Sequence, residues 1–175
     1  VKLTISLVNP IGVNLGANDA CTVTIEDDEH PLAAILNSYS TGQDDHWGDH
    51  YDWTIKLTRD DDDLSKVWIA NLEPYFASYN YIAPKYNFFY GIVNDEKTEI
   101  RVPVGQEIGY ANSSGEQILL GGIDKDGNLL ETGANIIIEI KDGGNVLFIP
   151  YPWGVRETAG WWSLFDGNTT FTKVQ

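Results

Sequence analysis

The densest group of residues that could do chemistry is segment 44–52, which reads Asp-Asp-His-Trp-Gly-Asp-His-Tyr-Asp. Its four aspartates and two histidines could bind a metal ion or hold a water molecule for hydrolysis. The spacing of His46 and His50 fits no closed zinc site, and Gly48 argues against a helix that would align them. We therefore expect an exposed loop, with a hydrolytic site of Asp44, Asp45, His46 and His50 as the alternative.

Two other acidic segments are candidates for calcium, because carboxylate oxygens suit hard cations. Asp60 to Asp63 are four consecutive aspartates, and a bound cation would relieve their repulsion. Segment 124–128, Asp-Lys-Asp-Gly-Asn, begins like an EF-hand loop, but the twelfth position is Asn135 instead of glutamate. We predict a polar turn at both places, with a calcium role for 60–63 as the alternative.

Aromatic side chains gather in two segments that contain prolines. Tyr79 and Tyr81 lie in the segment 74–85, and Trp153 and Trp161 lie in or beside the segment 150–160. We read both segments as loops at the mouth of a barrel. Exposed rings on loops can stack on a sugar, a peptide or another protein. These four residues are the predicted ligand-binding residues, and packing in the core is the alternative.

Recognisable catalytic motifs are missing from the sequence. The pairs Gly121-Gly122 and Gly143-Gly144 lack the lysine and hydroxyl residue of a phosphate-binding loop, and no Gly-x-Ser-x-Gly is present. Acidic residues are so frequent that no pair stands out for glycoside cleavage. Cys21 is the only cysteine, which excludes an intrachain disulfide. We expect no catalysis.

Charge and length restrict the partners of the chain. The 175 residues carry a formal net charge of −15, so nucleic acid and anionic membranes are poor partners. Apolar runs are too short to span a bilayer. The sequence starts at Val1, not at a methionine, and we expect it to be a mature or trimmed piece of a longer product.

Alternation of apolar and polar residues predicts an all-β fold. The clearest examples are 53–58, Trp-Thr-Ile-Lys-Leu-Thr, and 98–102, Thr-Glu-Ile-Arg-Val. Turn-forming clusters separate such runs at 60–63, 94–97, 124–128, 142–145 and 166–168. We predict an antiparallel meander of about ten to twelve strands that closes into a barrel. Within it, 32–36 is read as a short strand that ends at 38–42.

The composition changes at His30-Pro31, where we place a boundary between residues 1–30 and 31–175. Segment 15–28, Leu-Gly-Ala-Asn-Asp-Ala-Cys-Thr-Val-Thr-Ile-Glu-Asp-Asp, resembles the end of a Calx-beta domain. The resemblance implies that residues 1–30 are the last two strands of an immunoglobulin-like sandwich. It also implies that Asp27 and Asp28 supply part of a calcium site whose other ligands lie outside this chain. A solvated acidic linker is the alternative.

Residues 31–175 resemble, more loosely, the barrel domains that follow such modules in surface lipoproteins of gut Bacteroidetes. The resemblance rests on Trp-Thr-Ile-Lys-Leu at 53–57, Val-Trp-Ile-Ala-Asn-Leu at 67–72 and Tyr-Gly-Ile-Val at 90–93, followed by 98–106. It implies a lipocalin-like barrel, export, and a location at the extracellular or outer-membrane surface, with the periplasm as the alternative. An upstream lipid anchor would be compatible with it.

These observations favour a cell-surface binding or adhesion-type module for a glycan or a partner protein, with calcium as a candidate cofactor. A hydrolase that uses segment 44–52 is the second hypothesis. A structural spacer that holds other domains away from the membrane is the third.

Overall fold

The computed structural model describes residues 2–6, 11, 20–24, 30–75 and 87–175. The chain forms two compact units, 1–30 and 31–175. In the first unit, β1 (Lys2–Ser6) pairs with β2 (Ala20–Thr24) as an antiparallel two-stranded ladder.

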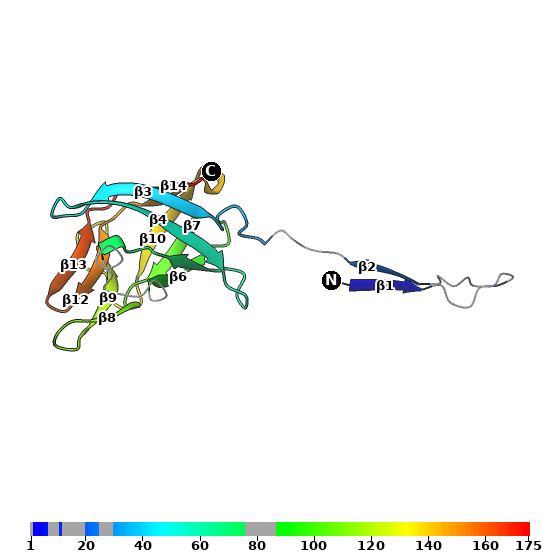
Figure 1. Cartoon of the computed structure of the whole chain (residues 1–175), viewed down its shortest axis with the longest axis horizontal. Coiled ribbons are helices and arrows are strands. Elements are labelled where there is room, and N and C mark those ends of the chain that lie inside the picture. The colour runs from blue at the N-terminus through cyan, green and yellow to red at the C-terminus, as the bar shows by residue number, and fades with distance from the viewer. Residues whose placement is uncertain (1, 7–10, 12–19, 25–29, 76–86) are drawn as a thin grey trace. The chain divides into compact units, whose positions relative to one another are not determined.

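The second unit contains a closed barrel of eight antiparallel strands, as the alternating pattern predicts (Figure 1). The barrel strands are β3 (Ser38–Asp44), β4 (His50–Arg59), β5 (Lys66–Ala70), β6 (Phe88–Val93), β7 (Glu99–Pro103), β10 (Asn135–Lys141), β11 (Val146–Ile149) and β14 (Thr169–Lys173). They follow one another around the barrel in chain order, and β14 pairs with β3 to close it. This is the up-and-down arrangement of lipocalin-like barrels.

Two hairpins leave the barrel and pair with each other. The first, β8 (Glu107–Ala111) and β9 (Gln117–Gly122), lies in the chain between β7 and β10, and the second, β12 (Trp153–Glu157) and β13 (Gly160–Phe165), lies between β11 and β14. Because β9 pairs with β12, they form one four-stranded sheet in the order β13-β12-β9-β8. Both hairpins start and finish at the same end of the barrel, so this sheet lies at that end (Figure 1).

Aromatic packing joins the four-stranded sheet to the barrel. Phe165 of β13 lies between Trp153 and the barrel residue Trp53, with ring centroids 5.0 and 5.3 Å away. Trp53 also meets Phe171 of β14 edge to face at 5.5 Å. Since these rings are buried, the sheet shares one hydrophobic core with the barrel end that it covers.

The opposite end of the barrel is covered by the turn 31–35, whose Leu32 and Ile35 are buried. The phenol O–H of Tyr39 donates to the carbonyl of Gly144 (2.7 Å), and the carbonyl of Ile35 lies 3.2 Å from the same hydroxyl. The expectation of a strand at 32–36 that ends at 38–42 is therefore wrong. Segment 32–36 contains a turn, and 38–42 belongs to β3, whose serine and threonine residues hid its alternation.

The alternating sequence explains the barrel interior. Along β4 the buried residues are Tyr51, Trp53, Ile55 and Leu57, and the residues between them face outward. The equivalent positions of the other strands place Val67, Ile69, Phe89, Ile100, Val102, Ile138 and Leu147 in the same core. The barrel interior is thus packed with side chains.

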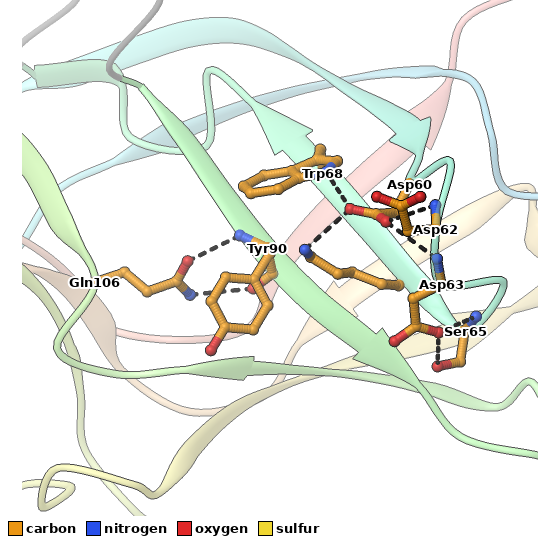
Figure 2. Close-up of polar contacts among 8 residues, drawn as sticks. Asp60, Asp62, Asp63, Ser65, Trp68, Tyr90 and Gln106 are labelled. Atoms are coloured by element: carbon orange, nitrogen blue, oxygen red, sulfur yellow. Dashed lines mark hydrogen bonds and ion pairs between the residues drawn. The ribbon is translucent and has the colours of Figure 1, made fainter.

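One side-chain amide replaces strand pairing where β6 and β7 diverge. Their ladder contains only Ile92↔Arg101 and Val93↔Ile100. Beyond it, the Gln106 amide accepts from Tyr90 N–H (2.8 Å) and donates to the Tyr90 carbonyl (3.0 Å), as Figure 2 shows. Gln106 therefore provides hydrogen-bond partners for the Tyr90 N–H and carbonyl of β6, where the two strands separate.

Candidate functional site

Trp153 does not have the exposed position predicted for it. It lies in β12 instead of a loop, its side chain is fully buried, and its indole N–H donates to Thr169 Oγ1 at 2.9 Å. The reading of 150–160 as a loop at the barrel mouth is wrong, because most of it is the β12–β13 hairpin. Trp153 is a core residue that cannot contact a ligand at the surface.

Trp161 of β13 is partly exposed and lies on the opposite face of the four-stranded sheet, which we call the outer face. Its strand partner is Arg156 of β12, and the guanidinium carbon of Arg156 lies over the Trp161 ring, 5.7 Å from its centroid. A β-bulge between Val155 and Arg156 shifts the register here. Bulges re-aim side chains, and this one places an arginine and a tryptophan together on the outer face.

Gly121 provides the space for this pair. A Cβ atom at Gly121 would lie 2.9 Å from Arg156 Cδ and 3.1 Å from Trp161 Cη2. Both side chains therefore lie close to the backbone of β9 at Gly121, where any larger residue would displace them. Gly121 has no positive φ, so close approach, not backbone conformation, is the reason for glycine.

A pocket of about 110 Å³ adjoins Arg156 on this face. Two carboxylates border it, those of Glu116 and Glu157. Glu116 accepts from the backbone N–H of Thr158, and Glu157 accepts from the side-chain amide of Asn112. The hydrogen bonds from Thr158, with a smaller contribution from the nearby Arg156 charge, hold the pKa of Glu116 below its ordinary value.

Arg156 differs from the other two arginines of the chain. Arg59 pairs with Asp61 at 3.4 Å, and Arg101 pairs with Glu99 at 2.5 Å. Within the described residues, Arg156 has neither an ion pair nor a hydrogen bond, and its Nε atom is enclosed by the protein. In a chain with a net charge of −15, a cation without a carboxylate partner among the described residues thus borders the pocket.

Segment 44–52 contains a tight turn between β3 and β4 in which the two histidines have different partners. His46 pairs with Asp166 (2.8 Å), whereas His50 pairs with Asp44 (2.5 Å). The hydrogen bond with Asp44 raises the pKa of His50. Asp45 is buried and accepts the backbone N–H groups of Trp47 and Asp49, so it shapes the turn. Asp44, Asp45, His46 and His50 do not converge on one point.

In the turn 60–65, aspartate side chains are bound by other groups of the protein, as Figure 2 shows. The carboxylate of Asp60 accepts from Lys66 Nζ (2.9 Å), from Trp68 Nε1 (2.8 Å) and from the backbone N–H groups of Asp62 and Asp63. The Lys66 ammonium also lies 4.4 Å from the Trp68 ring centroid. These contacts, above all the one with Lys66, lower the pKa of Asp60 to about 2. The Lys66 ammonium and the backbone N–H groups thus offset the negative charge of Asp60, as a bound metal ion would.

The predicted turn at 124–128 is confirmed, since Asp124 accepts the backbone N–H groups of Asp126 and Asn128. No cluster of three or more His, Cys, Asp or Glu side chains suited to a metal ion occurs within the described ranges. Asp27 and Asp28, the predicted calcium ligands, lie outside those ranges, as do Tyr79 and Tyr81.

Of the predicted ligand-binding residues, the structure describes Trp153 and Trp161, and it places only Trp161 at the surface beside other polar groups. Sequence reasoning missed Arg156, Glu116 and Gly121. A usable signal was present at 153–157, because Arg156 follows an apolar run and directly precedes a second charged residue. The sequence does not show, however, that β9 lies beneath it.

No helix in the described part of the chain is long and apolar enough to cross a membrane. Comparison of the chain with protein-family models, with curated proteins and with solved structures finds no match.

Proposed function

We propose that this protein is a cell-surface binding module and that it recognises a glycan on the outer face of its four-stranded sheet. The observation that carries the proposal is the pairing of Trp161 and Arg156 over Gly121, next to a pocket bordered by carboxylates. Aromatic rings bind the apolar faces of sugars, and pocket carboxylates, amides and hydroxyls orient the sugar hydroxyls.

The position of the site supports a binding role. It lies on a sheet whose other face is fixed to the barrel by buried aromatic rings, so its side chains are held on a rigid support. A preformed site loses little conformational entropy when a ligand binds. The Calx-beta resemblance, the calcium role of Asp27 and Asp28, and the location at the outer-membrane surface belong to the same proposal.

A glycan array followed by isothermal titration calorimetry on the full chain tests this function. We expect at least one oligosaccharide to bind and Trp161→Ala to weaken it about 30-fold or more, as truncation of a central aromatic contact does. Trp47→Ala is the matched control, because Trp47 is 57% exposed but lies in the turn between β3 and β4.

Both variants must retain the melting temperature of the wild-type protein. The proposal is wrong if no glycan binds, or if a bound glycan has the same affinity for Trp161→Ala. The first result would favour the spacer hypothesis.

A further inference from the structure

We infer that the ligand of this site carries a single carboxylate, such as one terminal uronic acid on an otherwise neutral glycan, and that Arg156 binds it. The inference rests on the proposed function and names the ligand class. It follows from which polar groups of the pocket are already engaged and which are not.

The two carboxylates at the pocket are engaged within the protein. Glu116 is bound by the Thr158 backbone and Glu157 by Asn112. One oxygen of each carboxylate is thus held by the protein, and neither carboxylate forms an ion pair with the Arg156 guanidinium. Of the charged groups at the pocket, the guanidinium of Arg156 has no hydrogen bond or ion pair with the described residues, and its enclosed Nε atom has no partner.

A guanidinium presents five N–H donors in a planar fork that matches a carboxylate, and such charge-assisted pairs are stronger than neutral hydrogen bonds. The enclosed Nε and the Trp161 ring hold the Arg156 side chain against the sheet. Little rotamer freedom is therefore lost when a carboxylate pairs with its outer nitrogens.

The charge of the chain limits the ligand to one anionic group. With a net charge of −15 and two carboxylates beside Arg156, a polymer of acidic sugars would be repelled along its length. A single carboxylate on the guanidinium avoids this repulsion, since the rest of the ligand is neutral. We therefore expect the protein to prefer a glycan with one acidic sugar over both a neutral glycan and a polyuronate.

The test uses three probes and the full chain. The probes are a neutral oligosaccharide bearing one terminal uronic acid, the methyl ester of the same molecule, and a polyuronate. Calorimetry should show the free acid binding at least tenfold more tightly than its ester and than the polyuronate per sugar. Added salt should weaken the binding of the free acid and leave the binding of the ester unchanged, because only the acid forms an ion pair.

Variants then assign this preference to Arg156. Arg156→Gln should bind acid and ester equally, whereas Arg156→Lys should keep part of the preference. Trp161→Ala should lower the affinity for acid and ester by the same factor. Arg101→Gln is the matched control, because Arg101 pairs with Glu99 on the barrel. The melting temperature of each variant reports whether it folds.

The outcomes separate the inference from the proposed function. Equal binding of acid and ester, both weakened by Trp161→Ala, would refute the carboxylate preference and leave glycan recognition intact. A preference that survives in Arg156→Gln would likewise exclude Arg156 as its source. If no probe binds and the glycan array is empty, both the carboxylate inference and the proposed glycan recognition are refuted.

Discussion

The hydroxyl of Ser163 donates a 2.7 Å hydrogen bond to Oε1 of Glu73, and both side chains are fully buried. Ser163 belongs to β13, whereas Glu73 follows β5, so this bond joins the four-stranded sheet to the barrel. The same Glu73 oxygen accepts the backbone N–H of Tyr75 at 3.0 Å, and Asn87 donates to the Glu73 carbonyl at 2.6 Å. A polar network thus reinforces the aromatic contacts between the two sheets.

Replacement of Ser163 by alanine should destabilise the protein by about 1–3 kcal/mol, because a buried carboxyl group loses a hydrogen-bond donor. Urea denaturation followed by tryptophan fluorescence measures the change. Ser65→Ala serves as the control, since the Ser65 hydroxyl binds Asp63 in an exposed turn and its loss should cost less. Equal costs at both positions would show that the Ser163–Glu73 bond does not secure the sheet.

Replacement of Trp153 by alanine should cost about 3–5 kcal/mol, because it empties a fully buried position between the barrel and the four-stranded sheet. The loss of its stacking on Phe165 and of its bond to Thr169 adds to the cost. Trp47→Ala, at an exposed position, should change stability by less than about 0.5 kcal/mol. Thermal melting of the two variants distinguishes these roles, and a Trp153→Ala variant as stable as wild type would contradict the packing described.

Asp60 should make the stability of the barrel depend on pH in the acid range. Its pKa falls from 3.8 to about 2 on folding, so the folded state favours the carboxylate. This contribution is complete above about pH 4 and is lost as pH falls through about 2. In Asp60→Asn, melting temperatures should therefore change less between pH 4 and pH 2 than in wild type. Asp61→Asn, whose side chain is 86% exposed, is the control and should follow the wild-type curve.

Tyr39 should contribute the opposite dependence at alkaline pH. Burial raises its pKa from 10.0 to about 12, so the folded state favours the neutral phenol. The stabilisation is complete below about pH 10 and is lost as pH rises toward 12. The difference in phenolate absorbance between wild type and Tyr39→Phe isolates this titration, and a midpoint near 10 would contradict it.

Tyr39→Phe should also destabilise the protein at neutral pH by about 1–3 kcal/mol, since the Gly144 carbonyl loses the phenol as a donor. Urea denaturation at pH 7 measures this cost. Tyr151→Phe is a suitable control, because Tyr151 is 42% exposed. A Tyr39→Phe variant with unchanged stability would mean that water replaces the phenol at no cost.

Much of the barrel follows from local patterns in the sequence. Trp53, Ile55 and Leu57 alternate with polar residues, and such a run places one face in a core wherever the strand lies. The turns at 60–63 and 142–145 were equally predictable, because aspartate and glycine favour the bends that connect antiparallel strands. At Asp142, Gly143 and Gly144 the backbone has positive φ, as a tight connection after β10 requires.

The hairpin 153–165 could not be placed in this way. Its residues Trp-Gly-Val-Arg-Glu show no clean alternation, because Gly154 and Val155 are both buried and a bulge shifts the register at Arg156. Aromatic residues are common in cores and at binding surfaces alike, so residue type could not separate Trp153 from Trp161.

The all-β class and most strand positions follow from the sequence, since they depend on residues close together in the chain. The pairing of β9 with β12, the inward position of Trp153, and the place of Arg156 over Gly121 without a carboxylate partner among the described residues come only from tertiary contacts. Those features depend on which distant segments meet. A local pattern records which side chains share a face of a strand, but not what that face lies against.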